Sequence, residues 1–288
     1  MEYYGKLFRP PSEARSLIIQ VTIGCAQNTC TFCSMYKEDH FSIRPQADIL
    51  RDLQEMARPY HGIRKLFLAD GDALVVPTDR LLAIIHQAYA LYPFLEQVNA
   101  YATVQDILRK SDQELTDLKK AGLDLLYIGL ESGDDEILKK IHKPMTQAQY
   151  IEALKKAKKA GLRTSVTMIL GLGEKDHSKQ HIQGCVQAIT ASRPDFLAFL
   201  SLHLQPGAPL YEAVRSGQFY EINDEEKMAE MRSFLSQVDS PGTVFRSNHA
   251  SNPVAIAGTL NQDREKMLRQ IDQAVRYQAY RPEGWRNL

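Results

Sequence analysis

The stretch "SLIIQVTIGCAQNTCTFCSMYK", residues 16–37, places three cysteines directly after an apolar run. The segment "SLIIQVTIG" (16–24) predicts a buried strand, because it is short and rich in β-branched and aliphatic residues. Cys25, Cys30 and Cys33 follow within nine positions and are three of the four cysteines in the chain. Cysteines clustered on one loop of a protein in a reducing compartment indicate metal ligands or redox groups before disulfides.

The alternation of apolar runs and helical patterns continues outward from this stretch to about residue 218. We expect strands at 16–24, 65–70, 96–103, 123–132, 163–173 and 195–204, and helices near 46–58, 78–92, 111–121, 134–142, 146–160, 177–191 and 208–216. Strands that alternate with helices of this length predict βαβ units and a parallel sheet. Six such units fit a partial (β/α)6 TIM-like barrel or, alternatively, a doubly wound sheet, and in both folds the chemistry gathers at the carboxyl ends of the strands.

The alternation stops after residue 218, so we expect residues 1–218 to form the α/β barrel and 219–288 a mainly helical C-terminal extension that packs on it or closes it. Helical patterns at 223–237 and 261–279 flank the segment 245–259, which is expected to be irregular.

Composition narrows the classes of function. The 288 residues hold 35 Lys plus Arg and 35 Asp plus Glu, so the net charge is zero and does not favour nucleic acid or anionic membrane as a partner. No apolar run approaches the roughly 20 residues that span a bilayer. The first 16 residues lack the apolar core of a signal peptide, and we expect a cytoplasmic protein.

The cysteine triplet favours an iron–sulfur cluster over zinc. A structural zinc site normally has four protein ligands, which His40 or the distant Cys185 would have to complete. A cluster is also held by thiolates, and three ligands leave one iron of a [4Fe–4S] cube open to substrate or cofactor. Cys185 lies in the helical pattern "HIQGCVQAI", where a buried small side chain is expected.

These residues resemble the radical S-adenosylmethionine (SAM) enzymes, a family with a cysteine-rich loop after the first strand of a partial (β/α)6 barrel. The usual spacing is C-x3-C-x2-C with an aromatic residue before the last cysteine, a place that Phe32 holds here. The first gap departs from it, since Cys25 and Cys30 are separated by four residues. The resemblance implies that the three cysteines bind a [4Fe–4S] cluster whose fourth iron takes the amino and carboxylate groups of SAM.

Two further segments resemble SAM-binding parts of this family. In "ADGDA" (69–73), Gly71 and Asp72 match the second glycine and the acid of a Gly-Gly-Glu-like segment that holds the SAM amino group, and Asp70 replaces the first glycine. "GLESGDDEILKKIHKPMT" (129–146) resembles the subgroup with oxygen-independent coproporphyrinogen oxidase, Elongator-type and methylthiotransferase enzymes. There Glu131 would contact the SAM ribose and Lys143 the SAM carboxylate.

The resemblance extends to residue 216. "SVTMILGLG" (165–173) resembles the strand beside the adenine, with Thr167 at a ribose-contacting position and Gly171 in the glycine pattern. "LQPGAPLYE" (204–212) resembles the segment after the sixth strand in the same subgroup.

Three residues near the end of the chain are candidates for the substrate. His203 follows the sixth predicted strand and could face substrate or, alternatively, be a hydrogen-bonded core histidine. Arg246 and His249 lie in the polar "FRSNHASN" (245–252), which with Asn248 and Asn252 could bind substrate or, equally, form an ordinary hydrogen-bonded loop. Arg246 would suit an anionic group.

The family resemblance implies reductive cleavage of SAM to a 5′-deoxyadenosyl radical, with the electron coming from a donor such as flavodoxin or ferredoxin. We expect a small-molecule substrate. An RNA-modifying enzyme and a non-catalytic zinc-stabilised binding protein remain the alternatives.

Overall fold

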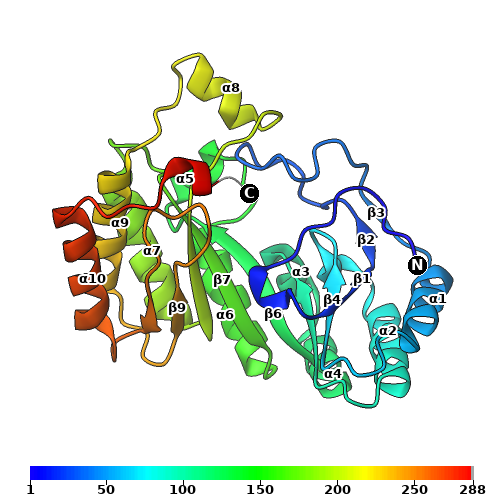
Figure 1. Cartoon of the computed structure of the whole chain (residues 1–288). Coiled ribbons are helices and arrows are strands. Elements are labelled where there is room, and N and C mark those ends of the chain that lie inside the picture. Colours follow the sequence, from blue (N-terminus) through cyan, green and yellow to red (C-terminus); the bar gives the residue numbers. More distant parts are fainter. Residues whose placement is uncertain (287–288) are drawn as a thin grey trace. The chain divides into compact units, whose positions relative to one another are not determined.

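The structure is a computed structural model that describes residues 1–286 (Figure 1). The chain divides into two compact units. The first unit holds residues 1–28, 35–128 and 155–164, and the second holds residues 29–34, 129–154 and the chain from 165 onward. Strands β6 (Leu123–Glu131) and β7 (Arg163–Leu170) each begin in the first unit and end in the second.

The first unit is built on parallel strands in the order β1-β4-β5-β6. Its further strands are β1 (Leu17–Gln20), β4 (Lys65–Ala69), β5 (Gln97–Tyr101) and a short hairpin of β2 (Thr22–Ile23) and β3 (Ser42–Ile43). Its helices are α1 (Gln46–Ala57), α2 (Thr78–Leu91), α3 (Val104–Arg109) and α4 (Asp112–Ala121), with short 3-10 turns η1 (Pro11–Glu13) and η2 (Ala73–Val75). All four residues of β1 are buried, as expected for a parallel strand covered on both faces.

The second unit continues with strands in the order β7-β8-β9-β10. Strands β8 (Phe196–Ser201) and β9 (Val244–Arg246) run parallel, and β10 (Ala257–Thr259) runs antiparallel to β9. The helices are α5 (Asp135–Lys140), α6 (Gln147–Lys159, which ends in the first unit), α7 (Ser178–Ser192), α8 (Pro209–Arg215), α9 (Asp224–Gln237) and α10 (Arg264–Arg276), followed by the 3-10 turn η3 (Glu283–Trp285). Helix α9 packs against both α7 and α10 (Figure 1).

The two faces of the second unit's sheet differ in burial. Leu197, Phe199 and Phe245 are fully or almost fully buried, and the Phe199 ring lies 4.8 Å from that of Phe234 in α9. Because side chains alternate along a strand, Ala198 and Arg246 lie on the opposite face, where they are partly or fully exposed.

The α/β class and the predicted parallel strands are confirmed, and each predicted helix is present. Ser111 caps α4 in a capping box with Glu114, and Gly122 ends that helix with φ of 115°. The expectation of an irregular 245–259 is wrong at its ends, because β9 and β10 form there. Strands of three residues are too short for an alternation of apolar and polar residues to be recognised in the sequence.

The C-terminal extension shares the second unit with β7 and β8 and supplies β9 and β10. The boundary at residue 218 stays a prediction. Within residues 1–286, no helix combines the length and the apolar character that crossing a bilayer requires.

Candidate functional site

The second unit contains the end of the cysteine loop, residues 29–34. The Cys33 N–H donates to the Cys30 carbonyl (3.4 Å), so a turn keeps these two partly exposed residues close together, with Phe32 between them. The Thr31 N–H donates to the Ile141 carbonyl (3.0 Å), and the Thr31 carbonyl accepts from the Leu210 N–H (2.8 Å). Backbone hydrogen bonds therefore hold this segment between the ends of two motifs singled out in the sequence, 129–146 and 204–212.

The first unit contains Cys25 beside the turn after β4. The Cys25 Sγ lies 3.9 Å from the Gly71 carbonyl oxygen. A Cβ at position 71 would lie 2.8 Å from the Cys25 Cβ and 2.7 Å from a ring carbon of Tyr36, closer than such atoms approach. The absence of a side chain at Gly71 thus lets the turn backbone approach the cysteine loop. Asp72, the next residue, is buried.

Asp70, at the position where the resemblance expects the first glycine of the Gly-Gly-Glu-like segment, forms two side-chain hydrogen bonds. Its carboxylate accepts from the Tyr36 hydroxyl (2.7 Å) and from the Gln20 amide (2.9 Å). Burial raises the pKa of Asp70, while these two hydrogen bonds act in the opposite direction. Asp70 thereby ties Tyr36, three residues after the last clustered cysteine, to the β4 turn. Tyr36 could not be recognised from the sequence, because nothing in its spacing indicates a partner 34 residues away.

Three thiolates are the donor set expected for iron–sulfur chemistry, and all three clustered cysteines are at least partly exposed. Cys25 belongs to the first unit, and Cys30 and Cys33 belong to the second. Across residues 1–286, no three His, Cys, Asp or Glu side chains form a ready-made metal site, so the ligand set stays a prediction.

The additional ligands considered for zinc lie in different environments. His40 is exposed, and Cys185 is fully buried, where its sulfur accepts from the Gly133 N–H (3.2 Å). Burial raises the pKa of the Cys185 thiol, which disfavours the thiolate form that a metal requires. The expectation that Cys185 is a buried small side chain is confirmed.

Glu131 and Lys143 form an ion pair, with 3.0 Å between Lys143 Nζ and Glu131 Oε1. The two side chains are only 10% and 13% exposed. Glu131 ends β6 with a φ of 62°, and Lys143 follows α5, so the twelve-residue spacing of the motif brings the two charges together. Their contacts with the SAM ribose and carboxylate stay predictions.

Gly171 ends β7 in a left-handed conformation, with φ of 91°. Its N–H donates to Glu230 Oε2 (2.8 Å), and the other oxygen of Glu230 accepts from the Ser178 hydroxyl (2.7 Å). Glu230 lies in α9, so the C-terminal extension holds the turn that the sequence places beside the adenine. Glu230 could not be recognised from the sequence, because an acid within an acidic helix gives no sign that it points inward. Thr167 lies in β7 and is partly exposed.

We expect Glu230 to give the protein a pH-dependent stability. Burial raises the pKa of Glu230 to about 7. The Glu230 carboxyl loses its proton at a lower pH in the unfolded chain than in the folded chain. The free energy of unfolding should therefore fall as the pH rises from about 4.5 to 7. Glu230→Gln keeps a hydrogen-bond acceptor and removes the titration. The variant should match wild type at pH 5 and exceed it at pH 8 by up to a few kcal/mol, measured by urea unfolding. Equal stability at pH 8 contradicts the assignment.

The three substrate candidates differ in exposure. His203 and Arg246 are exposed, and His249 is half-buried. Asn252, in the same segment, is fully buried. Its amide donates to the Phe199 carbonyl (2.6 Å) and the Ser247 carbonyl (3.1 Å), and its oxygen accepts from the Ser201 hydroxyl (3.0 Å). Asn252 therefore fastens the loop after β9 to β8, which fits the alternative of an ordinary hydrogen-bonded loop.

Residues 19–183 match the family model of the radical SAM superfamily. The heme chaperone HemW of Bacillus subtilis is 17% identical over 230 residues, 77% of this chain and 60% of the relative. The tRNA-2-methylthio-N(6)-dimethylallyladenosine synthase of Vibrio cholerae is 23% identical over 255 residues, 81% of this chain and 51% of the relative. The chain thus spans between half and about three fifths of the length of these relatives.

The crystal structure of methylornithine synthase matches with a TM-score of 0.55 and 13% identity, covering 93% of this chain and 82% of that one. At this identity the likeness shows the fold alone. The structural neighbours in this superfamily are partial TIM barrels, which confirms the predicted barrel over the doubly wound sheet.

Proposed function

The chain belongs to the radical SAM superfamily, whose members are enzymes that use a [4Fe–4S] cluster and SAM, and we propose that it cleaves SAM reductively and acts on a small-molecule substrate. One observation carries the proposal. The matched region contains the three-cysteine loop, and the β4 turn approaches the first of its cysteines through Gly71.

The proposed roles of the cysteines and of the Gly71 turn follow from the family motifs that these residues match. We propose that Cys25, Cys30 and Cys33 hold three irons of the cluster, and that the Gly71 turn receives the SAM amino group. With an electron from a donor such as flavodoxin or ferredoxin, the bound cluster and SAM supply methionine and a 5′-deoxyadenosyl radical that takes a hydrogen atom from the substrate.

The test is anaerobic reconstitution followed by metal analysis and an assay with SAM and a reductant. We expect about four iron and four sulfide per chain, and formation of 5′-deoxyadenosine. One zinc per chain in a colourless protein would instead support the zinc-stabilised binding protein. A cluster without 5′-deoxyadenosine contradicts the catalytic proposal.

Lys143→Ala should weaken SAM binding and leave the cluster intact. The variant removes the ammonium group proposed for the SAM carboxylate, and charged hydrogen bonds of this kind contribute about 1.5–3 kcal/mol, or roughly tenfold or more in affinity. SAM affinity of the reconstituted enzyme, measured by equilibrium dialysis, is the readout. Lys139→Ala, which removes an exposed lysine of α5, is the matched control. Unchanged affinity in Lys143→Ala removes its proposed role.

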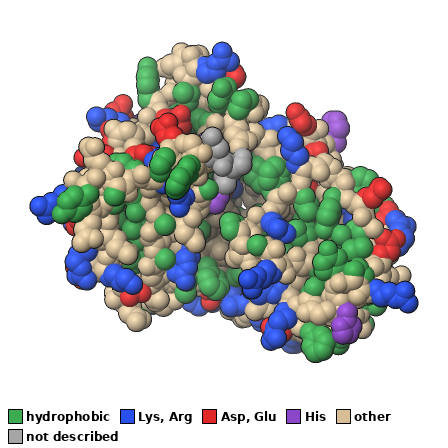
Figure 2. All heavy atoms as spheres, viewed as in Figure 1, with side chains coloured by type: hydrophobic (Ala, Val, Ile, Leu, Met, Phe, Trp, Pro, Cys, Tyr) green, Lys and Arg blue, Asp and Glu red, His purple; other side chains and the backbone are tan. Residues whose placement is uncertain are grey.

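A second candidate substrate is RNA, because one relative is a tRNA-modifying synthase that aligns with 81% of the chain. Zero net charge counts against it, and both acidic and basic side chains occur over the face seen in Figure 2. Copurification of tRNA, and binding that falls steeply with salt, would support the RNA substrate.

A further inference from the structure

The exposed face of the second unit's sheet carries Arg246 in one row with Thr167. Thr167 of β7 pairs in register with Ala198 of β8, and Ala198 pairs with Arg246 of β9. Residues in register in a parallel sheet lie side by side on the same face, about 4.8 Å apart per strand. Arg246 therefore lies two strands, or roughly 10 Å, from the residue predicted to contact the SAM ribose.

Arg246 is available to bind a ligand. One guanidinium N–H donates to the carbonyl of the neighbouring Phe245 (2.8 Å), and the side chain is exposed. An arginine has five N–H donors, and its planar group can bind carboxylate or phosphate with two parallel hydrogen bonds.

His249 follows in the loop after β9, and its tautomer is fixed by hydrogen bonds. The Ser251 N–H donates to its Nδ1 (3.2 Å), and the Ser251 hydroxyl lies 2.8 Å from the same nitrogen. The Ser251 oxygen in turn accepts from the Ser201 N–H (3.2 Å). Because Nδ1 is an acceptor, the neutral ring carries its proton on Nε2 and presents a second donor at the end of β9.

The surroundings of His249 are positively charged. The Arg281 guanidinium donates to the His249 carbonyl (2.9 Å) and the Ala250 carbonyl (2.8 Å). The pKa of His249 is lowered, first by burial and then by the charges of Arg281 and His203. Among residues 1–286, no carboxylate forms an ion pair with Arg246, Arg281 or either histidine, and Arg286, which donates to the Arg281 carbonyl, pairs with Asp224. Within the described chain, Arg281 beside the His249 loop and Arg246 at the end of β9 are therefore two positive charges without a carboxylate partner.

We propose that Arg246, together with His249 and His203, binds an anionic group of the substrate, a carboxylate or a phosphate. The inference rests on the proposed function and names the class of its substrate. Arg246 supplies the charge and the paired donors, and the two histidines supply further donors from the segments that follow β8 and β9.

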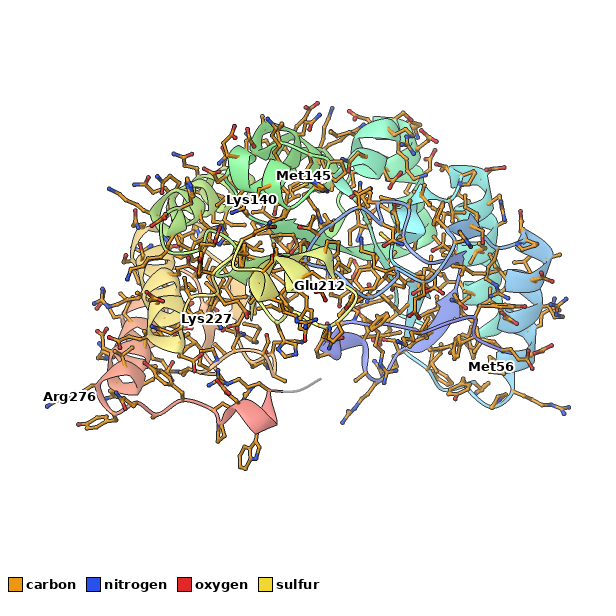
Figure 3. All side chains as sticks on the ribbon, turned by 90° about the horizontal axis from the view of Figure 1, so that it is seen from above. Met56, Lys140, Met145, Glu212, Lys227 and Arg276 are labelled. Carbon is orange, nitrogen blue, oxygen red and sulfur yellow. The ribbon has the colours of Figure 1, made fainter. Side chains whose placement is uncertain are left out.

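The first experiment measures anion binding to the reconstituted, SAM-saturated enzyme by calorimetry at low ionic strength, with inorganic phosphate and acetate as separate probes. We expect at least one of them to bind, with affinity reduced roughly tenfold or more in Arg246→Gln and partly restored in Arg246→Lys, which keeps the charge without the planar fork. The matched control is Arg276→Gln, since Arg276 points outward from α10 (Figure 3).

Three results overturn the inference. They are no binding of either anion to wild type with or without SAM, equal binding to wild type and Arg246→Gln, and binding to wild type only in a parallel titration without SAM, which would assign the site to the SAM carboxylate. The proposed function is judged separately by 5′-deoxyadenosine formation in wild type. A wild-type enzyme that cleaves SAM but binds neither anion leaves that function standing.

The second experiment separates cell metabolites by anion exchange and adds each fraction to wild-type enzyme with SAM and reductant. The compound that accelerates 5′-deoxyadenosine release should be in the fraction retained by the resin. Acceleration only by the unretained, uncharged fraction contradicts the inference.

Discussion

Cys30→Ala is expected to reduce both cluster assembly and SAM cleavage to background. Each of the three thiolates is proposed to hold a different iron, so the set has no spare ligand, and no nearby cysteine can substitute. Cys185 cannot replace it, because its thiol is buried with a raised pKa. The readouts are iron and sulfide content, the visible absorbance of the reconstituted protein and 5′-deoxyadenosine formation under anaerobic conditions.

Cys185→Ala is the matched control for this experiment. It removes a thiol from the same chain and should leave the iron content at the wild-type value. A Cys30→Ala protein that still assembles the cluster and cleaves SAM shows that Cys30 is not a ligand. Loss of iron in both variants would point to general unfolding, which circular dichroism of the two proteins distinguishes.

Much of the fold was predictable from local signals. Apolar runs gave the parallel strands, and Ser111 and Gly122 marked the ends of α4, because capping depends on residues close in sequence. The site residues that could be predicted, such as Glu131 and Lys143, belong to motifs with fixed spacing. The ion pair between Glu131 and Lys143 is consistent with the two residues belonging to one motif with a fixed spacing of twelve residues.

The remaining site residues could not be predicted, because their meaning depends on distant partners. Tyr36 matters through Asp70, and Glu230 matters through the Gly171 turn, 59 residues earlier. Arg246 was a candidate from the sequence, but its position two strands from Thr167 follows only from the register of β7, β8 and β9. The sequence left two alternatives open for Asn252, and only the structure shows that its amide pairs with buried backbone carbonyls.

Gly133→Ala should be the most destabilising of the glycine substitutions. Gly133 follows β6 in the "GLESG" motif and packs directly on the backbone of Gly184 in α7. A Cβ at position 133 would lie 2.2 Å from the Gly184 carbonyl carbon and 2.4 Å from the Cys185 nitrogen. Because both neighbours are backbone atoms, the clash requires the turn and the helix to separate, at a cost of about 3 kcal/mol in the free energy of unfolding. Urea unfolding measures it.

The same separation should break two hydrogen bonds that join these segments. The Gln147 side-chain amide donates to the Gly133 carbonyl (2.7 Å) and to the Gly184 carbonyl (3.0 Å), so it requires the two backbones to stay close. Gly284→Ala is the matched control, because a Cβ there meets no atom within 4 Å, and its stability should stay within about 0.5 kcal/mol of wild type. If Gly133→Ala and Gly284→Ala are equally stable, the β6 turn and α7 must leave more room for a Cβ than these distances indicate. Close packing would then not explain the glycine at position 133.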